Sequence, residues 1–288
     1  MKHTALFLLS LAVVACGGRE SASSTKAASQ RPLTIKGSDT MVILTQRLSE
    51  EYMKTHAGER VQVNGGGSGT GIAALINGTV DLAQASRPMK DEEKASAEKS
   101  RGAQIVETAV ALDSLAVFAN EGNTVKELTI EQLAGIYTGK VKNWKDVGGK
   151  DATIILYGRE NSSGTYDYFK EHVLDKADFA NTVQTLQGTA AIVNAVARDA
   201  NGIGYGGIAY DKGVRALALR KDAATPAIAP SEATVADGTY PLSRKLYFYA
   251  LSNAPERVTK FVQWTLTPEA QALVKNVGYF PLSDQAAH

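Results

Sequence analysis

Hydrophobic and polar positions follow two different periods along this chain, one typical of strands and one typical of helices. Short apolar runs bounded by Gly, Ser or Asp predict strands, whereas apolar residues three and four positions apart predict helices. Leu44, Leu48 and Tyr52, for example, share one face of a predicted helix at 41–56, directly after a predicted strand at 33–36. Further strands are predicted at 61–63, 80–83, 154–157, 203–206 and 246–251, with two apolar runs at 105–110 and 115–119. Further helices are predicted after 71 and after 129, at 90–99 with a solvated surface, and at 166–174, 255–265 and 268–276. This alternation predicts an α/β fold with mainly parallel sheets.

The first 16 residues differ from the rest of the chain. Lys2 precedes an apolar run at 5–15, which is shorter than the ~20 residues of a transmembrane helix and fits the apolar part of a secretory signal. Cys16 follows directly, and the segment resembles a lipoprotein signal in which residues 1–15 are removed and Cys16 receives the lipid, palmitate included. An ordinary signal peptide with a leftover thiol, or a buried Cys, is the alternative. Residues 16–31, rich in Gly, Ser and Ala, predict a flexible tether, so we expect a lipid-anchored protein in the periplasm or on the cell surface.

Composition narrows the class of protein further. Of the 288 residues, 44% are hydrophobic and 21% are charged, which is typical of a globular chain. The 31 basic and 30 acidic residues give a formal net charge of +1, so the chain has no general attraction for nucleic acid. A single Cys excludes an intrachain disulfide, and the four His have no metal-ligand spacing. We therefore expect no metal, no other cofactor and no nucleic-acid partner.

Three predicted strand-to-helix junctions carry the candidate chemistry. They lie at 37–41, 65–71 and 161–165, and each combines Gly with Ser or Thr. The first turn of a helix has unpaired N–H groups and the positive end of the helix dipole, Gly allows a ligand close to the backbone, and hydroxyl groups add donors. Arg159, four residues before Ser163, can add a bidentate guanidinium. Because ligands of open α/β sheets bind at the carboxyl ends of strands, these junctions predict an anion site.

Each junction also has a simpler explanation, because Ser and Thr are standard N-caps that need no ligand. Other known motifs fit less well. The glycines at 65–71 are not followed by the Lys-Ser or Lys-Thr pair of a P-loop. The segment 69–74 fits a weak dinucleotide pattern, but no acidic residue follows at a strand end about 20 residues later. No Ser nucleophile has a suitable His partner, so the pattern favours binding over catalysis and we expect no enzyme.

The order and spacing of these segments resemble the phosphate-binding proteins of bacterial high-affinity phosphate ABC importers. The resemblance extends from about 35 to 281 and is carried by Gly-Ser-Asp-Thr at 37–40 and by the segments 65–71, 80–87, 128–144, 159–165 and 202–205. It implies a two-lobed periplasmic-binding-protein fold with two crossover strands, near 112–118 and 245–251, and a ligand cleft between the lobes. Lobe I would comprise 32–113 plus 250–288, and lobe II would comprise 114–249.

The same resemblance implies a ligand, partners and binding residues. Inorganic phosphate would be clamped between the lobes and delivered to the membrane permease of an ABC importer, by a protein that we expect to be a monomer. The expected phosphate-binding residues are Ser38, Thr40, Met41 (through its main-chain N–H), Ser68, Ser86, Arg159, Ser163, Gly164 and Thr165. Another oxyanion such as sulfate, tungstate or arsenate, a phosphatase using the same anion site, and an adhesion or sensor lipoprotein with this fold are the alternatives.

One position departs from the family pattern. Some members have Asp where this chain has Ser86, and that carboxylate accepts a hydrogen bond that protonated phosphate can donate and sulfate cannot. We expect Asp39, in the first junction, to take over this acceptor role; the alternative is that Asp39 only caps a helix. Arg87 either binds the anion or braces loops through ion pairs, and we favour bracing.

The lipid-anchor interpretation predicts that Cys16→Ala releases the protein from the membrane fraction, because the substituted residue has no thiol to acylate. Fractionation of cells followed by immunoblotting measures this. A variant that stays in the membrane fraction would contradict the interpretation.

Overall fold

Residues 31–282 are the part of the chain that the structure, a computed structural model, describes. The predicted signal peptide at 1–15, the predicted lipidation site Cys16 and all of the predicted tether except Arg31 lie outside these residues. Within the described range, none of the helices combines the length and the apolar character needed to cross a membrane.

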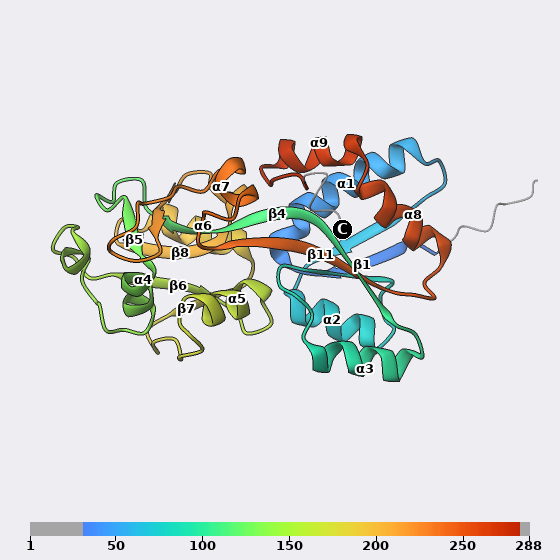
Figure 1. The fold of residues 1–288 in the computed structure, drawn as a ribbon, viewed down its shortest axis with the longest axis horizontal. Helices are drawn as coiled ribbons and strands as arrows, with labels where there is room; N and C mark the ends of the chain where they lie inside the picture. The colour runs from blue at the N-terminus through green and yellow to red at the C-terminus, as the bar shows by residue number, and fades with distance from the viewer. Residues whose placement is uncertain (1–30, 283–288) are drawn as a thin grey trace, which may run out of the picture. The chain divides into compact units, whose positions relative to one another are not determined.

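The first lobe is built on a parallel sheet of three strands. β1 (Leu33–Gly37) lies between β2 (Val61–Asn64) and β3 (Leu82–Ala85) and runs parallel to both. The helices of this lobe are α1 (Val42–Thr55), α2 (Ser68–Ile76), α3 (Asp91–Arg101), α8 (Glu256–Thr265) and α9 (Pro268–Val277), and they lie around the strands in Figure 1. The predicted apolar face of α1 is confirmed, because Leu44, Leu48 and Tyr52 are buried in one core cluster with residues of β1, α8 and α9. α3 is the predicted solvated helix and buries only Ala97.

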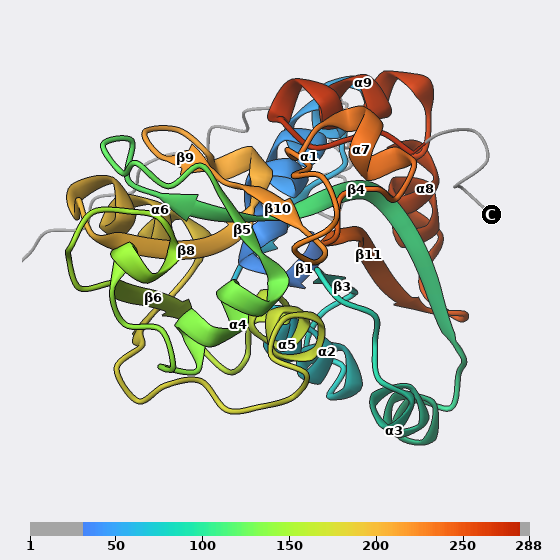
Figure 2. The same ribbon diagram turned by 60° about the vertical axis from the view of Figure 1, so that its left-hand side comes forward.

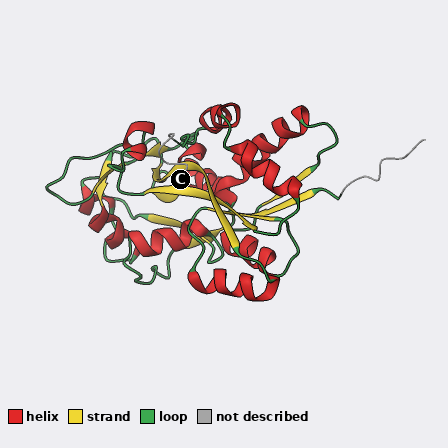
Figure 3. Ribbon diagram, turned by 45° about the vertical axis from the view of Figure 1, so that its right-hand side comes forward, coloured by secondary structure: helices red, strands yellow, loops and turns green. Residues whose placement is uncertain are grey.

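The second lobe repeats this arrangement. β6 (Ile155–Arg159) lies between β7 (Gln184–Leu186) and β8 (Gly202–Gly207) and runs parallel to both. Its helices α4 (Ile130–Tyr137), α5 (Gly164–His172) and α6 (Thr189–Arg198) lie outside the strands, as Figure 3 shows for the helices of both lobes. The smaller elements are β5 (Glu127–Thr129), η2 (Trp144–Val147), η3 (Ile208–Tyr210), β9 (Arg215–Ala216), β10 (Ala218–Arg220) and α7 (Glu232–Ala236), besides η1 (Asp39–Met41) of the first lobe.

Two long strands cross between the lobes and join their sheets. β4 (Ile105–Ala119) and β11 (Ser243–Leu251) pair with each other in antiparallel fashion, side by side in Figure 1, and give the strand order β2-β1-β3-β11-β4-β8-β6-β7. The prediction of mainly parallel sheets therefore holds inside each lobe, whereas the crossover strands run antiparallel to their neighbours. They do so because the chain passes from the first lobe to the second through β4 and returns through β11. The exact lobe boundaries at 113/114 and 249/250 stay a prediction.

β4 also joins the two apolar runs that the sequence separates. The polar pair between them, Asp113 and Ser114, is fully buried instead of ending the strand. The strand continues because Asp113 faces Arg244 of β11, whose Nε donates to Asp113 Oδ2 at 2.8 Å. Asp113 Oδ1 also accepts the main-chain N–H of Ile208 from the second lobe. A buried charge needs such compensation. Asp113 thus connects the two crossover strands to each other and to Ile208 of the second lobe.

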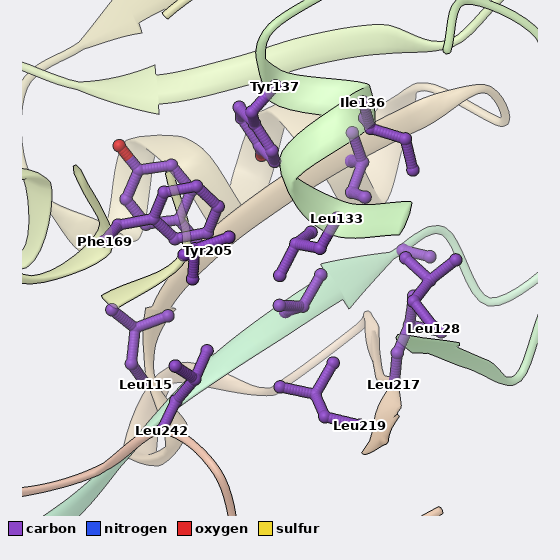
Figure 4. Close-up of a cluster of buried hydrophobic side chains, with 14 of the residues drawn as sticks. Leu115, Leu128, Leu133, Ile136, Tyr137, Phe169, Tyr205, Leu217, Leu219 and Leu242 are labelled. Carbon is purple, nitrogen blue, oxygen red and sulfur yellow. The ribbon is translucent and has the colours of Figure 1, made fainter. Parts of the chain in front are cut away.

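An aromatic stack fixes α5 on the sheet of the second lobe (Figure 4). The rings of Phe169 on α5 and Tyr205 on β8 are stacked with centroids 4.1 Å apart, and Tyr137 of α4 meets Tyr205 edge to face at 5.4 Å. Such pairs stabilise packing beyond the area that they bury. Because Phe169 lies only five residues after Gly164, the first residue of α5, the stack also helps to fix the position of the N-terminus of α5.

Some elements have no counterpart in the prediction. Strands of two or three residues, such as β9 and β5, are too short to show a period of two. α6 is different, because Ile192, Val193 and Val196 lie on its buried face at helical spacing, so the sequence held a signal that the prediction missed.

Candidate anion-binding site

The three predicted junctions lie together in the structure. They form the segment before α1, the N-terminus of α2 and the N-terminus of α5, and Figure 2 shows α2 and α5 next to each other. Thr40 Oγ1 lies 2.9 Å from Thr165 Oγ1, which in turn lies 3.5 Å from Ser86 Oγ. Ser86 Oγ is 3.5 Å from Ser68 Oγ, and all four side chains are fully buried. Hydroxyl groups from both lobes thus form one contiguous cluster inside the protein.

Two glycines allow the lobes to approach this closely. A Cβ on Gly164 would lie 2.3 Å from Ser68 Oγ, so only glycine fits at the start of α5. Gly67 has a φ of +93° and a Cβ there would lie 2.4 Å from Ser162 O of the second lobe. Across the same contact, the N–H of Gly69 donates to Ser162 O at 2.9 Å. Backbone therefore meets backbone between the lobes, which explains why glycine stands at positions 67 and 69 of the second junction.

Arg159 brings a positive charge to the first junction, where it pairs with Asp39. It ends β6 and is 2% exposed, so its guanidinium must be paired. Nη2 donates to Asp39 Oδ2 of the first lobe at 3.0 Å and to Glu160 Oε1 at 2.9 Å, and Nε donates to Glu160 Oε2 at 3.1 Å. Nη1 donates to the hydroxyl of Thr189 at 3.1 Å. One cation and two carboxylates meet here, so these three groups together carry a formal charge of −1.

Asp39 links the first two junctions and the opposite lobe. Its Oδ1 accepts the main-chain N–H of Gly66 at 2.8 Å, while Oδ2 accepts from Arg159. It makes no side-chain cap of η1, so its contacts differ from those of the helix cap that was the alternative. Each carboxylate oxygen has a second lone pair, so both can still accept a hydrogen bond from a ligand.

Main-chain N–H groups add donors to the same place. Asp39, Thr40, Ser68 and Gly164 stand at the starts of η1, α2 and α5, and their N–H groups have no acceptor among residues 31–282. N–H groups at helix starts are common donors to bound anions, so these four are available to an anion.

Three predicted site residues have fewer groups free to contact a ligand. The hydroxyl of Ser163 caps α5 by accepting the N–H groups of Thr165 and Tyr166, which leaves its own proton free to donate. The N–H of Met41 is engaged with Ser38 O at 3.1 Å, and its side chain is buried in the core. Ser38 takes part through its backbone, because its N–H donates to Gln84 O and its carbonyl accepts from Gln84 Nε2.

Arg87 braces the lobes outside this cluster, as predicted. Its Nη1 and Nη2 donate to the two carboxylate oxygens of Glu93 at 2.8 Å, and its Nε donates to Asp167 Oδ2 of α5 at 2.8 Å. Burial alone would raise the pKa of Glu93, but the hydrogen bonds from Arg87 and from the Lys90 N–H outweigh it and hold the pKa below its usual 4.5. The guanidinium is thus bound by carboxylates of both lobes, and Nη1 also donates to Pro88 O.

Sequence reasoning missed several residues around the site. They are Gln84, Glu160, Thr189, Tyr210 and Tyr279. Only Thr189 carried a usable signal, because Gly188-Thr189 at the start of α6 repeats the pattern of the other junctions. Residues 31–282 contain no group of three or more His, Cys, Asp or Glu side chains placed to hold a metal ion.

Comparison with known proteins agrees with this geometry. A family model described as a PBP superfamily domain matches residues 22–269. The phosphate-binding protein PstS of Pseudomonas aeruginosa is 36% identical over 273 residues, covering 88% of this chain and 84% of that protein. The chain therefore belongs to the PBP superfamily and, within it, to the family of the phosphate-binding proteins named PstS.

Solved structures support the same assignment. A phosphate ABC transporter substrate-binding protein from Clostridium perfringens, with bound phosphate, has a TM-score of 0.81 at 28% identity and covers 88% of this chain and 100% of its own. An ABC-type phosphate transport receptor from Vibrio cholerae has a TM-score of 0.70 at 32% identity, covering 87% of this chain and 100% of its own. The expected two-lobed α/β fold is confirmed by these neighbours.

The lowered pKa of Glu93 leads to a prediction on stability. A carboxyl group whose folded pKa is depressed adds stability above its unfolded pKa and loses it as the pH falls through the folded value. Glu93→Gln should therefore lower the free energy of unfolding at pH 7, and the gap to the wild type should shrink below about pH 4. Urea denaturation at several pH values measures this, with Glu92→Gln, an exposed neighbour on α3, as the control. A gap that is the same at every pH would refute the assignment.

Proposed function

We propose that this protein captures inorganic phosphate between its two lobes and delivers it to the membrane permease of an ABC importer. The observation that carries the proposal is the convergence of buried donors from both lobes. Four buried hydroxyl groups of both lobes form one cluster, and the same three junctions add four N–H groups without an acceptor and the guanidinium that pairs with Asp39. These donors suit the oxygens of a tetrahedral anion. Family membership and the phosphate-bound structural neighbour support the same ligand.

The binding residues that we assign are those expected from the sequence. Thr40, Ser68, Ser86 and Thr165 would donate through their hydroxyl groups and Arg159 through its guanidinium. Ser163 would donate its free proton, Gly164 its N–H, and Ser38 and Met41 would shape the turn that presents the N–H groups of residues 39 and 40. Because donors come from both lobes, closure and binding would be one event.

The same set of groups supports transport rather than catalysis. Binding and release break no covalent bond, so a carrier requires neither a nucleophile nor a metal, and we propose that the protein is not an enzyme. It would act as a monomer outside the cytoplasmic membrane, in the periplasm or on the cell surface, held there by a lipid on Cys16.

Calorimetric titration of the purified protein with phosphate, sulfate and arsenate tests the proposed function. We expect phosphate to bind more tightly than sulfate. Tight sulfate binding without phosphate binding would favour the alternative of another oxyanion, and turnover of a chromogenic phosphoester would favour a phosphatase.

Arg159→Ala should weaken phosphate binding by at least about 30-fold, because a buried charged partner contributes ~2 kcal/mol or more to binding. Titration of the variant measures the change, and its circular dichroism spectrum checks the fold. Arg220→Ala, which removes an Arg paired with Glu127 of β5 in the same lobe, is the matched control. Near-unchanged affinity in Arg159→Ala would contradict the assignment.

Asp39→Asn should reduce the preference for phosphate over sulfate, because the amide replaces an obligatory acceptor by a group that can also donate. Competition titrations with both anions measure the preference. Asp199→Asn is the control, since Asp199 also accepts a main-chain N–H, that of Asn201, but lies outside the cluster. An unchanged preference in Asp39→Asn would remove Asp39 from this role.

A further inference from the structure

Three consecutive carbonyl groups of the turn before α1 each accept a side-chain hydrogen bond. Ser38 O accepts from Gln84 Nε2 of β3 at 3.0 Å, and Asp39 O accepts from the hydroxyl of Tyr210 at 2.9 Å. Thr40 O accepts from the hydroxyl of Tyr279, which follows α9. The donors come from three separate parts of the chain, so this is a feature of the tertiary structure and not of the turn alone.

Each of these carbonyl groups belongs to the same peptide unit as the N–H of the next residue. The carbonyls of Ser38 and Asp39 are joined in this way to the N–H groups of Asp39 and Thr40, which have no acceptor among the described residues. A donor on the carbonyl fixes the plane of the peptide and polarises its N–H, because hydrogen bonds in a chain strengthen one another. The turn is thus held by its carbonyl groups, and the orientation of the two free N–H groups is fixed with them.

We propose that Tyr210 and Tyr279 are positioning residues of the anion site. Tyr210 orients the N–H of Thr40 through its hydrogen bond to Asp39 O, and Tyr279 holds Thr40, whose hydroxyl group belongs to the cluster, through its hydrogen bond to Thr40 O. The inference rests on the proposed phosphate site. Neither tyrosine touches the hydroxyl cluster by any hydrogen bond within residues 31–282, so both act through the backbone of the turn.

The two tyrosines differ in the lobe from which they act. Tyr279 is fully buried and packs in the core of the first lobe with Met41, so its bond to Thr40 O is internal to that lobe. Tyr210 belongs to η3 and packs with the second-lobe cluster of Ile192 and Val196, so its bond to Asp39 O crosses between the lobes. Only the hydrogen bond from Tyr210 to Asp39 O therefore depends on closure of the two lobes.

Both phenols stay protonated over the physiological range and therefore remain donors. Burial raises the pKa of Tyr210 to about 12 and raises the pKa of Tyr279 well above its usual value. A positioning role through donation is thus available at every pH at which the protein is expected to work.

Tyr→Phe substitutions test the inference, since they remove one hydroxyl group and keep the ring. Tyr279→Phe and Tyr210→Phe should each raise the Kd for inorganic phosphate by roughly three- to tenfold, the usual contribution of one hydrogen bond. In Tyr210→Phe the change should appear mainly as faster dissociation in stopped-flow measurements, because the lost bond exists only in the closed form.

Tyr240→Phe is the matched control. Tyr240 is equally buried and its hydroxyl donates to a carbonyl, that of Leu115, at 3.1 Å, but far along the chain from the turn. The Tyr240→Phe variant should lose thermal stability, as Tyr279→Phe does, but its Kd for phosphate should be unchanged. A Kd unchanged in both Tyr210→Phe and Tyr279→Phe, or raised equally in Tyr240→Phe, would overturn the inference.

The outcomes separate this inference from the proposed function. One outcome would overturn only the positioning role: the wild type binds phosphate and Arg159→Ala weakens binding, but the two tyrosine variants leave it unchanged. If the wild type does not bind phosphate, the proposed function falls and the inference with it. Should Tyr279→Phe fail to fold, Tyr210→Phe, at a half-buried position, still decides the matter.

Discussion

The burial of the Arg159 guanidinium is the constraint on which the rest of the site depends. A cation that is almost excluded from solvent must find opposite charge or hydrogen-bond acceptors, since the cost of leaving it unpaired exceeds most single contributions to stability. Glu160 supplies part of this compensation from the same lobe, whereas Asp39 supplies the rest from the other lobe. The pairing of Arg159 with carboxylates of both lobes therefore stabilises the closed arrangement of the two lobes.

Besides the ion pair of Arg159 with Asp39, three further sets of contacts connect the two lobes. The hydroxyl groups of Thr40 and Thr165 meet in the cluster, and backbone meets backbone at Gly69 and Ser162. Farther out, Arg87 is shared between carboxylates of both lobes. At the crossover strands, Arg244 pairs with Asp113 and also donates to the carbonyl of Ser86 at 3.2 Å. Arg244 thus links the crossover region directly to the site, so a movement of Arg244 on β11 would change its hydrogen bond to Ser86 O.

Local sequence patterns identified most of the longer elements and the three junctions, because a period of two or 3.6 and a Gly-Ser-Thr helix start are properties of neighbouring residues. They also drew attention to Arg159, since it lies only four residues before Ser163, the N-cap of α5. The patterns could not identify Gln84, Tyr210 or Tyr279, whose partners are carbonyl groups 46, 171 and 239 positions away along the chain. A buried Tyr or Gln looks like any core residue until the tertiary structure shows what its polar atom touches. Local patterns also could not join the apolar runs at 105–110 and 115–119 into one strand, because the charge that compensates Asp113 lies 131 positions away.

The charge balance of the site also bears on release. Because Arg159 is already matched by Asp39 and Glu160, these three groups carry no net positive charge. Binding must therefore come from oriented donors, the guanidinium N–H groups of Arg159 included, and not from an excess of positive charge. Such donors act strongly only at short range and in a dry environment, where water does not compete for them. Separating the lobes removes the donors of one side and admits water to those of the other. Under the proposed function, opening the cleft is therefore enough to release the ligand, and no competing charge has to be supplied by the permease.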